Sequence, residues 1–499
     1  MKQKKVIIIG AGVSGLTTGI YLQKNGYKTQ ILEKNAVSGG ACIGWERKGC
    51  YIDGCIHWLV GTNPDSMFYS LWTDTRAITD ETEIFFQDDY AVFDLPNGKR
   101  LTIWSDLEKL KAELIAFAPE DEKQIIKFVN LIERFQKIEG PIDKPKELMG
   151  LGQLLKIAFT MLGDYMLVNK YSKISCGDYV KRFKNKELAH CISSFMAPSY
   201  NLMSLLYMLA RVSSKNGGIP IGGSLPFVQR MEKYYLELGG EIKHSASVKE
   251  VRIEKDTAVG VELDSGEFLP SDWVVSSTAA EHCIKTLLGG KYAVKDIDDK
   301  LSDMDTNPIY TYSTVAFKCD LDMSDKPLST HVDLDTPIVF DQEYDNLTIR
   351  NFSYDKTLKA PDGSCVIQAS IRGNDHMFFW WKDKKNNGTY KTEKVKFGER
   401  VKEFIENRYP ELKGKITIID VITPCTYERY LNSRHGSFQG FVRSVKGKVL
   451  SGKSFVKGLN NFLLSGQCVF HGGGLPPAGV MGRFSAQRIC HKDKKKFVY

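Results

Sequence analysis

The chain opens with MKQKKVIIIGAGVSGLTTGIYLQKNGYKTQILEKN, residues 1–35, and this stretch decides the fold. Val6 to Ile9 are four consecutive β-branched residues, which is typical of a strand buried on both faces of a parallel sheet. Gly10, Gly12 and Gly15 follow in the spacing G-x-G-x-x-G, and apolar positions then recur at helical spacing. The stretch predicts a strand, a tight turn and a helix whose N-terminus binds the phosphates of a dinucleotide.

The residues after this helix support the same interpretation. Lys28 to Glu33 has the pattern of a second strand, and Glu33 lies 18 residues after Gly15. That is near the spacing of about 20 residues expected for an acid that bonds a ribose hydroxyl. A basic start followed by an apolar run also resembles an export signal. We reject that alternative because three glycines interrupt the run, which continues into a charged, amphipathic helix.

The composition is that of a large soluble globular protein. Its 499 residues predict two domains, and its 42% hydrophobic and 26% charged residues are ordinary. No stretch reaches the roughly 18 uninterrupted apolar residues that a membrane span needs. The eleven cysteines form no framework, so a reducing cytosol is expected. The net charge of +8 is modest, and we interpret the basic ends as solvated, with a weak attraction to anionic lipid left open and no nucleic-acid partner expected.

Three later segments carry features that fit the same nucleotide site. Gly39 and Gly40 offer backbone N–H groups to a phosphate. A predicted β-meander starting near residue 240 returns to a parallel strand at Trp273 to Ser276. Near the end, a buried strand at Phe462 to Leu464 precedes a glycine- and proline-rich loop and a helix from about Ala478. The N-terminal dipole of that helix favours negative charge on whatever the loop holds.

With these motifs the sequence resembles the phytoene desaturase family of FAD-dependent oxidoreductases, which includes carotenoid isomerases and retinol saturases and is related to amine oxidases. The resemblance is carried by GAGVSGL with Glu33-Lys34, Gly39-Gly40, YIDGCIHWLVG (51–61), GGIPIGGSLPFVQRM (217–231), TPCTYERYLNSRHGSFQG (423–440) and GQCVFHGGGLPPAGVMGR (466–483). The DGCIH form is more similar to the saturase-like members than to the bacterial desaturases. The resemblance covers the whole chain.

The resemblance implies an α/β protein with a Rossmann-like FAD-binding domain of the glutathione-reductase or amine-oxidase type. That domain would comprise residues 1–70, 215–290 and 455–492, and a discontinuous α+β substrate-binding and helical cap domain would comprise 71–214 and 291–454. Ala41 stands where the family often has an arginine that contacts phosphate. The implied FAD-binding positions are Gly10, Ala11, Gly12, Val13, Ser14, Gly15, Glu33, Lys34, Gly39, Gly40, Ala41, Val248, Gly466, Gln467, Gly479, Val480 and Met481.

Two apolar stretches bear on the substrate. Residues 149–171 place leucine, phenylalanine and methionine side chains near one helical face, which fits either a membrane-surface helix or an ordinary core or lid helix. Residues 376–385, HMFFWWKDKK, fit either the lining of an apolar tunnel, a contact with lipid headgroups or an aromatic core strand.

The expected chemistry is hydride transfer between a flavin and a carbon–carbon bond of an apolar isoprenoid or polyene lipid, as desaturation, saturation or cis–trans isomerisation. His57 and His471 flank the predicted flavin loops and are candidates for exchanging the accompanying proton, although each could also simply bond loop backbone. Arg429, with Tyr430, is a candidate for orienting the substrate. No metal site is predicted.

Other functions compete with this interpretation. A flavin amine oxidase shares the expected fold, and a non-catalytic scaffold that binds FAD is a third alternative. A disulfide reductase is suggested by the C-x4-C spacing of Cys50 and Cys55 and by Cys42, but no second G-x-G-x-x-G follows. Without a nicotinamide domain, oxygen, a quinone or an external reductant is the expected electron partner. We expect a cytoplasmic protein that contacts the inner face of the membrane through 149–171.

Overall fold

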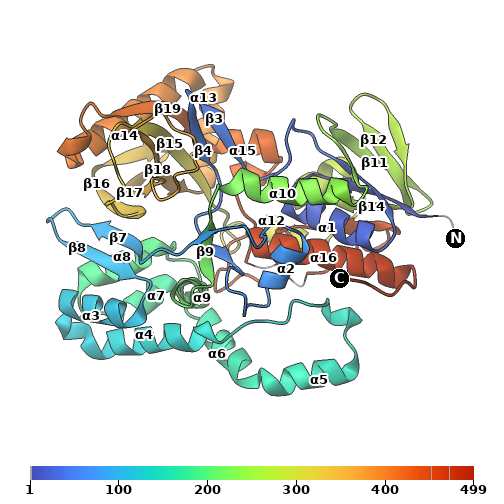
Figure 1. Ribbon diagram of the computed structural model, residues 1–499, viewed down its shortest axis with the longest axis horizontal. Helices are drawn as coiled ribbons and strands as arrows, with labels where there is room; N and C mark the ends of the chain where they lie inside the picture. The colour runs from blue at the N-terminus through green and yellow to red at the C-terminus, as the bar shows by residue number, and fades with distance from the viewer. Residues whose placement is uncertain (1–2, 451, 471) are drawn as a thin grey trace.

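The computed structural model describes residues 3–450, 452–470 and 472–499, and its first sheet is built around the opening strand (Figure 1). Five parallel strands lie in the order β10-β2-β1-β14-β20. Val6, Ile7 and Ile8 of the central strand are fully buried, because both faces of the sheet are covered. The strands are β1 Lys5–Ile9, β2 Lys28–Leu32, β10 Glu241–Lys243, β14 Trp273–Ser276 and β20 Phe462–Leu464. The strands predicted at Val6 to Ile9, Lys28 to Glu33, Trp273 to Ser276 and Phe462 to Leu464 are confirmed.

Three helices pack together beside this sheet: α1 Val13–Lys24, α10 Ser224–Glu237 and α16 Leu475–Lys492. Small residues allow the close approach, since a Cβ atom on Gly19 would lie 2.6 Å from the Tyr235 ring. On α16, a Cβ atom on Gly482 would lie 2.6 Å from the Ser14 carbonyl oxygen of α1. The first and last helices of the chain are therefore held directly against each other.

The predicted meander forms a separate three-stranded antiparallel sheet. It comprises β11 Val248–Glu254, β12 Thr257–Leu263 and β13 Phe268–Pro270, in that order. The strands of the two sheets described so far all fall in the segments 1–70, 215–290 and 455–492. The two sheets form the Rossmann-like part of the predicted α/β fold, and the predicted domain boundaries stay a prediction.

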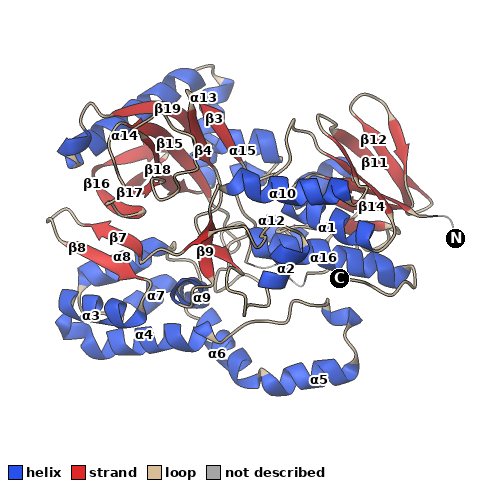
Figure 2. Cartoon of the chain, viewed as in Figure 1, coloured by secondary structure: helices blue, strands red, loops and turns tan. Residues whose placement is uncertain are grey.

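A second large sheet has seven strands in the order β19-β15-β18-β17-β16-β7-β8. Its neighbours are antiparallel except for β16 and β7. Helices α13 Asp375–Asn386 and α14 Tyr390–Arg408 cover one face (Figure 2), where Trp381 is fully buried. The strands are β7 Asp89–Asp94, β8 Arg100–Trp104, β15 Thr311–Cys319, β16 Ser329–Phe340, β17 Gln342–Asn351, β18 Cys365–Gly373 and β19 Ile416–Ile422.

A group of helices below this sheet in Figure 1 shares its own hydrophobic core. It comprises α3 Leu107–Phe117, α4 Glu122–Gln136, α7 Cys176–Val180, α8 Lys186–Phe195 and α9 Leu202–Ser213. The remaining short elements connect the parts. They are β3 Gly44–Arg47, β4 Cys50–Asp53, β5 Leu59–Val60, β6 Ile84–Phe85, β9 Gly217–Pro220, α2 Tyr69–Asp74, α11 Ala280–His282, α12 Lys295–Leu301 and α15 Pro424–Leu431.

The amphipathic stretch predicted at 149–171 forms two helices rather than one. α5 Leu151–Thr160 and α6 Leu162–Ser172 meet at 67°, and α5 runs along the outer edge of the molecule (Figure 1). No side chain of α5 is buried, and Phe159 is 91% exposed, so α5 is not a core helix. No described helix alone has the length and apolar content to span a bilayer; the bent pair α5–α6 meets that test by length and composition.

Two further predictions are corrected. Residues 376–385 form helix α13 rather than a strand, because the Asn374 side chain accepts the His376 N–H at 3.1 Å and caps a helix there. The last helix, α16, begins at Leu475, three residues before Ala478, because proline is compatible with the first turn of a helix. This shift changes which residues face the site described next.

Candidate active site

One large cavity lies between the five-stranded and seven-stranded sheets in the described part of the chain. Its volume is about 1250 Å³, above the roughly 300–1,000 Å³ typical of a site for one small molecule. Its wall contains Gly10 after β1, Glu33 after β2, Thr278 after β14 and Gly466 after β20. These residues mark the carboxyl edge of the parallel sheet, where ligands of open α/β folds bind. The cavity has room for a cofactor and a substrate together.

The glycine turn after β1 forms one end of the cavity. Gly10 has a φ of +99°, which side-chain-bearing residues rarely adopt. A Cβ atom on Gly15 would lie 2.0 Å from the Gly10 carbonyl oxygen, so the helix starts this close to the strand only with glycine there. Gly12 is the N-cap of α1, and no side chain caps that first turn. Its backbone N–H groups are therefore suited to a phosphate.

Glu33 supports this turn from the end of β2. Its side chain is buried, and Oε2 accepts the Ala11 N–H at 2.8 Å while Oε1 accepts the Asn35 N–H at 2.8 Å. Lys34 Nζ donates to Asn432 Oδ1 at 2.5 Å. Val248, the first residue of the meander strand β11, also lines the cavity. A buried carboxylate beside a glycine turn matches the ribose-binding acid predicted from the spacing.

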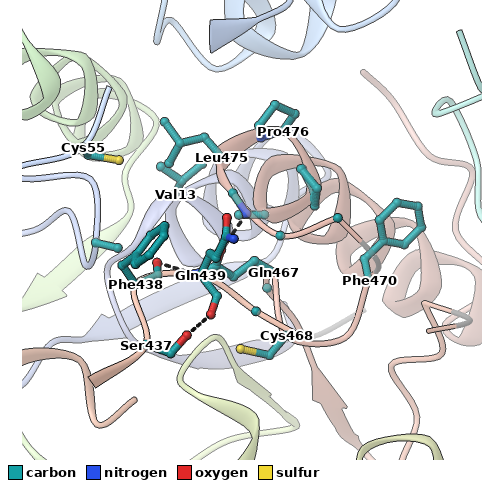
Figure 3. A pocket seen from close by; sticks show the side chains of 18 of the residues that line it. Val13, Cys55, Ser437, Phe438, Gln439, Gln467, Cys468, Phe470, Leu475 and Pro476 are labelled. Carbon is teal, nitrogen blue, oxygen red and sulfur yellow. Dashed lines mark hydrogen bonds between the residues drawn. The ribbon is translucent and has the colours of Figure 1, made fainter. Parts of the chain in front are cut away.

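The N-terminus of α16 forms the opposite wall (Figure 3). Gly474 caps it with a φ of +86° and no side-chain bond, and the Gln467 side chain holds the loop in place. Gln467 Oε1 accepts the Gly474 N–H at 2.6 Å, and Nε2 donates to the Phe438 carbonyl oxygen at 3.3 Å. The α1 and α16 N-termini thus open on one cavity, and both favour negative charge there.

Most predicted cofactor positions lie in the cavity wall: Gly10, Gly12, Val13, Ser14, Glu33, Lys34, Gly39, Gly40, Ala41, Val248, Gly466 and Gln467. Ala11 and Gly15 support the turn from behind, as described. Gly479, Val480 and Met481 are buried in α16 and are not among the described residues that line the cavity. Because α16 starts early, the residues of its first turn, Leu475 to Ala478, line the cavity instead. These features together fit a bound dinucleotide.

Asp53 explains why the DGCIH stretch is not a continuous strand. Its buried carboxylate accepts the Ser224 N–H at 2.5 Å, the Ser224 hydroxyl at 2.6 Å and the Cys55 N–H at 3.0 Å. These bonds turn the chain after β4 and carry His57 into the cavity wall. Burial, and then the positive charge of Arg350, lower the pKa of His57 well below its usual value. His57 is therefore an uncharged imidazole near neutral pH.

The other two predicted catalytic residues are placed differently. Arg429 is exposed on α15, with its guanidinium 5.2 Å from the centre of the Tyr430 ring, and it is not among the described residues of the cavity wall. The residues of α15 that do line the cavity are Tyr427, Leu431 and Tyr430, the residue predicted with Arg429 to orient the substrate. His471 lies outside the described residues, so its role stays a prediction.

The cysteines do not form the pair that a disulfide reductase needs. Cys50 is buried in β4 against the seven-stranded sheet, whereas Cys55 lies in the cavity wall beside Cys42. Burial, and then the neighbouring Cys55 thiol, raise the pKa of Cys42 well above its usual value. The Cys42 thiol is therefore protonated near neutral pH rather than a reactive thiolate.

The seven-stranded sheet contributes a polar wall that was not predicted. Alternate side chains of four strands face the cavity: Thr314 and Tyr312 on β15, Asn346, Thr348 and Arg350 on β17, Gln368, Ser370 and Arg372 on β18, and Ser329 and His331 on β16. The available signal was a charged residue inside an alternating strand, as in TIRNF at 348–352. The opposite wall is apolar, with Leu154, Ile157 and Met161 from α5 and its end.

Comparison with known protein families identifies the fold of the start of the chain. A family model described as an NAD(P)-binding Rossmann-like domain matches residues 8–75. That range contains the glycine turn, Glu33 and the Gly39-Gly40 pair. The match covers the nucleotide-binding start of the chain and not the second sheet.

Curated relatives match nearly the full chain at low identity. A phytoene desaturase (neurosporene-forming) of Rhodobacter capsulatus is 24% identical over 98% of this chain and 94% of its own. A chloroplastic prolycopene isomerase of Daucus carota is 21% identical over 98% and 80%. An inactive all-trans-retinol 13,14-reductase of Danio rerio is 23% identical over 84% and 74%. The resemblance to the phytoene desaturase family is confirmed.

Solved structures share the fold. An oxidoreductase from Methanosarcina mazei superposes with a TM-score of 0.59 at 14% identity, covering 97% of this chain and all of its own. A putrescine oxidase variant superposes with a TM-score of 0.62 at 14% identity, covering 98% and 99%. The chain therefore has the amine-oxidase type of architecture predicted for it.

Proposed function

We propose that this chain is an FAD-dependent oxidoreductase that acts on carbon–carbon bonds of an apolar polyene or isoprenoid lipid. The observation that carries the proposal is the continuous cavity, which joins a dinucleotide-binding turn to a chamber with an apolar wall. The named activities of the relatives, which are desaturation, isomerisation and retinol reduction, support the same class of substrate.

We propose one orientation of FAD along the cavity. Its pyrophosphate would lie at the uncapped start of α1, its ribose at Glu33 and its adenine near Val248, while the flavin would lie at the start of α16. Bound FAD supplies hydride transfer at one face of its ring, so that a CH–CH bond gains or loses one hydride and one proton. The N-terminal dipole of α16 stabilises negative charge at that end.

We propose that His57 transfers the proton that accompanies the hydride. It lines the cavity from the loop between β4 and β5. The hydrogen bonds from Ser224 to Asp53, four residues earlier in the chain, hold the start of this loop in place. An uncharged imidazole accepts a proton from substrate or water, or passes one on through its other nitrogen. The sheet wall and the chamber restrict water around the reacting carbons.

We further propose that the substrate enters from a membrane surface. Residues of α5 and α6 both line the cavity and expose apolar side chains outward, so one short segment joins the two. Lys156, Lys170 and Lys173 lie in or just after these helices and suit the anionic headgroup region. A lipid substrate would then reach the cavity without crossing water.

The direction of the reaction depends on the electron partner. Desaturation needs an acceptor such as oxygen or a quinone, saturation needs an external reductant, and isomerisation needs neither in net terms. The sequence carries a G-x-G-x-x-G turn at Gly10 to Gly15 and no second copy. We therefore propose a separate electron partner rather than a built-in nicotinamide site.

The test is anaerobic incubation of the purified holoprotein with polyenes while the flavin spectrum is followed. Bleaching without reductant establishes dehydrogenation, and reoxidation of chemically reduced protein establishes saturation. His57→Ala should keep its FAD and lose turnover by roughly 10²–10⁴-fold, whereas exposed His491→Ala should match wild type. Peroxide formation with amines instead of polyenes would make the chain an amine oxidase. A protein that takes up no FAD would refute the proposal.

A further inference from the structure

The cavity wall contains a half-buried cation, Arg350, with no counterion among the described residues. Arg350 lies on β17, opposite Ser329 of β16 and Gln368 of β18, and its side chain faces the cavity. Leu347 and Ile349 alternate with it and pack into the core under α13 and α14. The alternation of the strand therefore fixes the direction of Arg350 toward the ligand side.

No acidic side chain neutralises Arg350 within the part of the chain that the structure describes. Its guanidinium forms no ion pair and donates no hydrogen bond to another described residue, and burial lowers its pKa. The ionisable groups around it come from the facing elements and carry either no charge or a positive one. They are Tyr90 of β7, Tyr312 of β15, Tyr354 after β17, His331 of β16, Arg372 of β18 and His57 after β4.

Two fully buried arginines of this chain look different. Arg211 binds Glu139 at 2.9 Å and three carbonyl oxygens, and Arg488 binds Glu147 at 2.6 Å. Arg372, also in the cavity wall, donates to the Phe195 carbonyl oxygen at 3.2 Å. Arg211 and Arg488 are each paired with a carboxylate, as expected from the cost of burying an unpaired charge. Arg350 makes no such bond to a described residue, and its side chain lines the cavity. Arg443, elsewhere in the cavity wall, also has no described acidic partner and donates to the Met203 sulfur at 3.5 Å.

We propose that the substrate is a long-chain monocarboxylate, whose carboxylate pairs with Arg350 while its apolar tail lies along the α5–α6 wall. This deepens the proposed function and rests on it. A carboxylate matches the planar guanidinium with two parallel hydrogen bonds. Tyr90 and Tyr312 offer phenolic hydroxyls beside it, and Leu154, Ile157 and Met161 provide the apolar path.

The arrangement also links the head group to His57. The positive charge of Arg350 contributes to the low pKa of His57. A bound carboxylate neutralises that charge, so the imidazole becomes a better proton acceptor when the acid is in place. A neutral lipid in the same cavity would leave His57 unchanged. The site therefore favours acids in binding and in proton transfer.

The test compares retinoate with methyl retinoate, which differ in charge and share the same polyene tail. Binding to the oxidised holoprotein is measured near neutral pH from the change in the flavin spectrum. Wild type should bind retinoate at least about tenfold more tightly than the ester. Arg350→Gln should abolish this difference and leave the affinity for the ester unchanged, and Arg350→Lys should keep part of it. Exposed Arg182→Gln, which stacks on Tyr179, is the matched control and should behave as wild type.

Several outcomes would overturn the inference. Equal affinities in wild type would do so, and so would a preference for retinoate that survives in Arg350→Gln. Should Arg350→Gln fail to fold, an undiminished preference in Arg350→Lys and an unshifted His57 titration on adding retinoate would count against it. A changed flavin reduction potential in Arg350→Gln with an unchanged preference would assign Arg350 to the flavin instead. Absence of bound FAD would refute the proposed function, which is a distinct result.

Discussion

Two histidines outside the five-stranded sheet, His331 and His190, have pKa values that are shifted in opposite directions. Burial, and then the charges of Arg350 and Arg372, lower the pKa of His331 to about 3. The Nε2 atom of His190 lies 3.0 Å from both carboxylate oxygens of Asp333, and that bond raises its pKa. The first histidine lines the cavity near two arginines, and the second belongs to an ion pair outside the cavity wall.

These shifts predict opposite effects on acid stability. Between pH 6.5 and about 3 the unfolded chain binds a proton at residue 331 that the folded chain does not, so the free energy of unfolding falls as pH falls. His331→Gln should make that fall shallower, by at most about 1.4 kcal/mol per pH unit. Urea unfolding at a series of pH values measures the slope.

His190→Gln provides the contrast. A raised pKa stabilises the fold at acid pH, and that contribution is lost as pH rises through the folded value. Removing it should therefore make the loss of stability toward acid steeper. Slopes that change in the same direction in both variants would contradict the assignment of the two environments.

Helices α5 and α6 form the element that departs most from ordinary packing. Leu151 is 75% exposed, Leu155 62% and Phe159 91%, whereas the helices around α9 share a closed core. An exposed apolar surface of this kind marks an interaction site. Because α5 and α6 also line the cavity, we expect that the surface they contact and the substrate both belong to a lipid membrane.

The double variant Leu155→Ser, Phe159→Ser should lose binding to phospholipid vesicles. Each side chain contributes roughly 1.5–3 kcal/mol when it is fully taken out of water, so the partition coefficient should fall at least tenfold. Co-sedimentation with vesicles containing anionic lipid measures it. Phe268→Ser, on β13 at the meander and 47% exposed, is the control. Vesicle binding by the double variant equal to that of wild type would contradict the assignment.

At the scale of the whole molecule, one ligand site depends on both ends of the chain. β1 and α1 come from the first residues, and β20 and α16 from the last, and the two helices pack on each other. The cavity wall contains residues of both, from Gly10 to Ala478. A cofactor bound there bridges segments that are distant in sequence.

FAD should therefore stabilise the whole fold. At a free concentration of 100 times its Kd it should add about 2.7 kcal/mol to the free energy of unfolding, with a higher Tm than the FAD-free protein. Calorimetry with and without added FAD measures this. Glu33→Gln should reduce the effect by weakening the turn and the ribose contact, while Glu267→Gln, at an exposed ion pair with Lys243, should not. A Tm that stays unchanged when FAD is added would contradict the cofactor assignment.

The nucleotide half of the site could be predicted from local patterns. The strand at Val6–Ile9, the glycine turn, Glu33 and the strands at Trp273–Ser276 and Phe462–Leu464 are each decided by neighbouring residues, and the structure has them in place. Local patterns were insufficient at 376–385, where the cap at Asn374 selected a helix. They also misplaced the start of α16, because prolines that end one helix can begin another.

The sequence by itself determined the parallel sheet and its phosphate-binding turn, because periodicity and glycine spacing act between residues close in the chain. Tertiary structure alone decided that Arg350 faces a cavity without a counterion and that α5 lies uncovered. Which face of a strand borders the cavity, and whether a helix is covered by other elements, depend on the distant segments that pack against them. Charge and burial at those positions arise only when the segments from 1–70, 149–214, 291–454 and 455–492 come together.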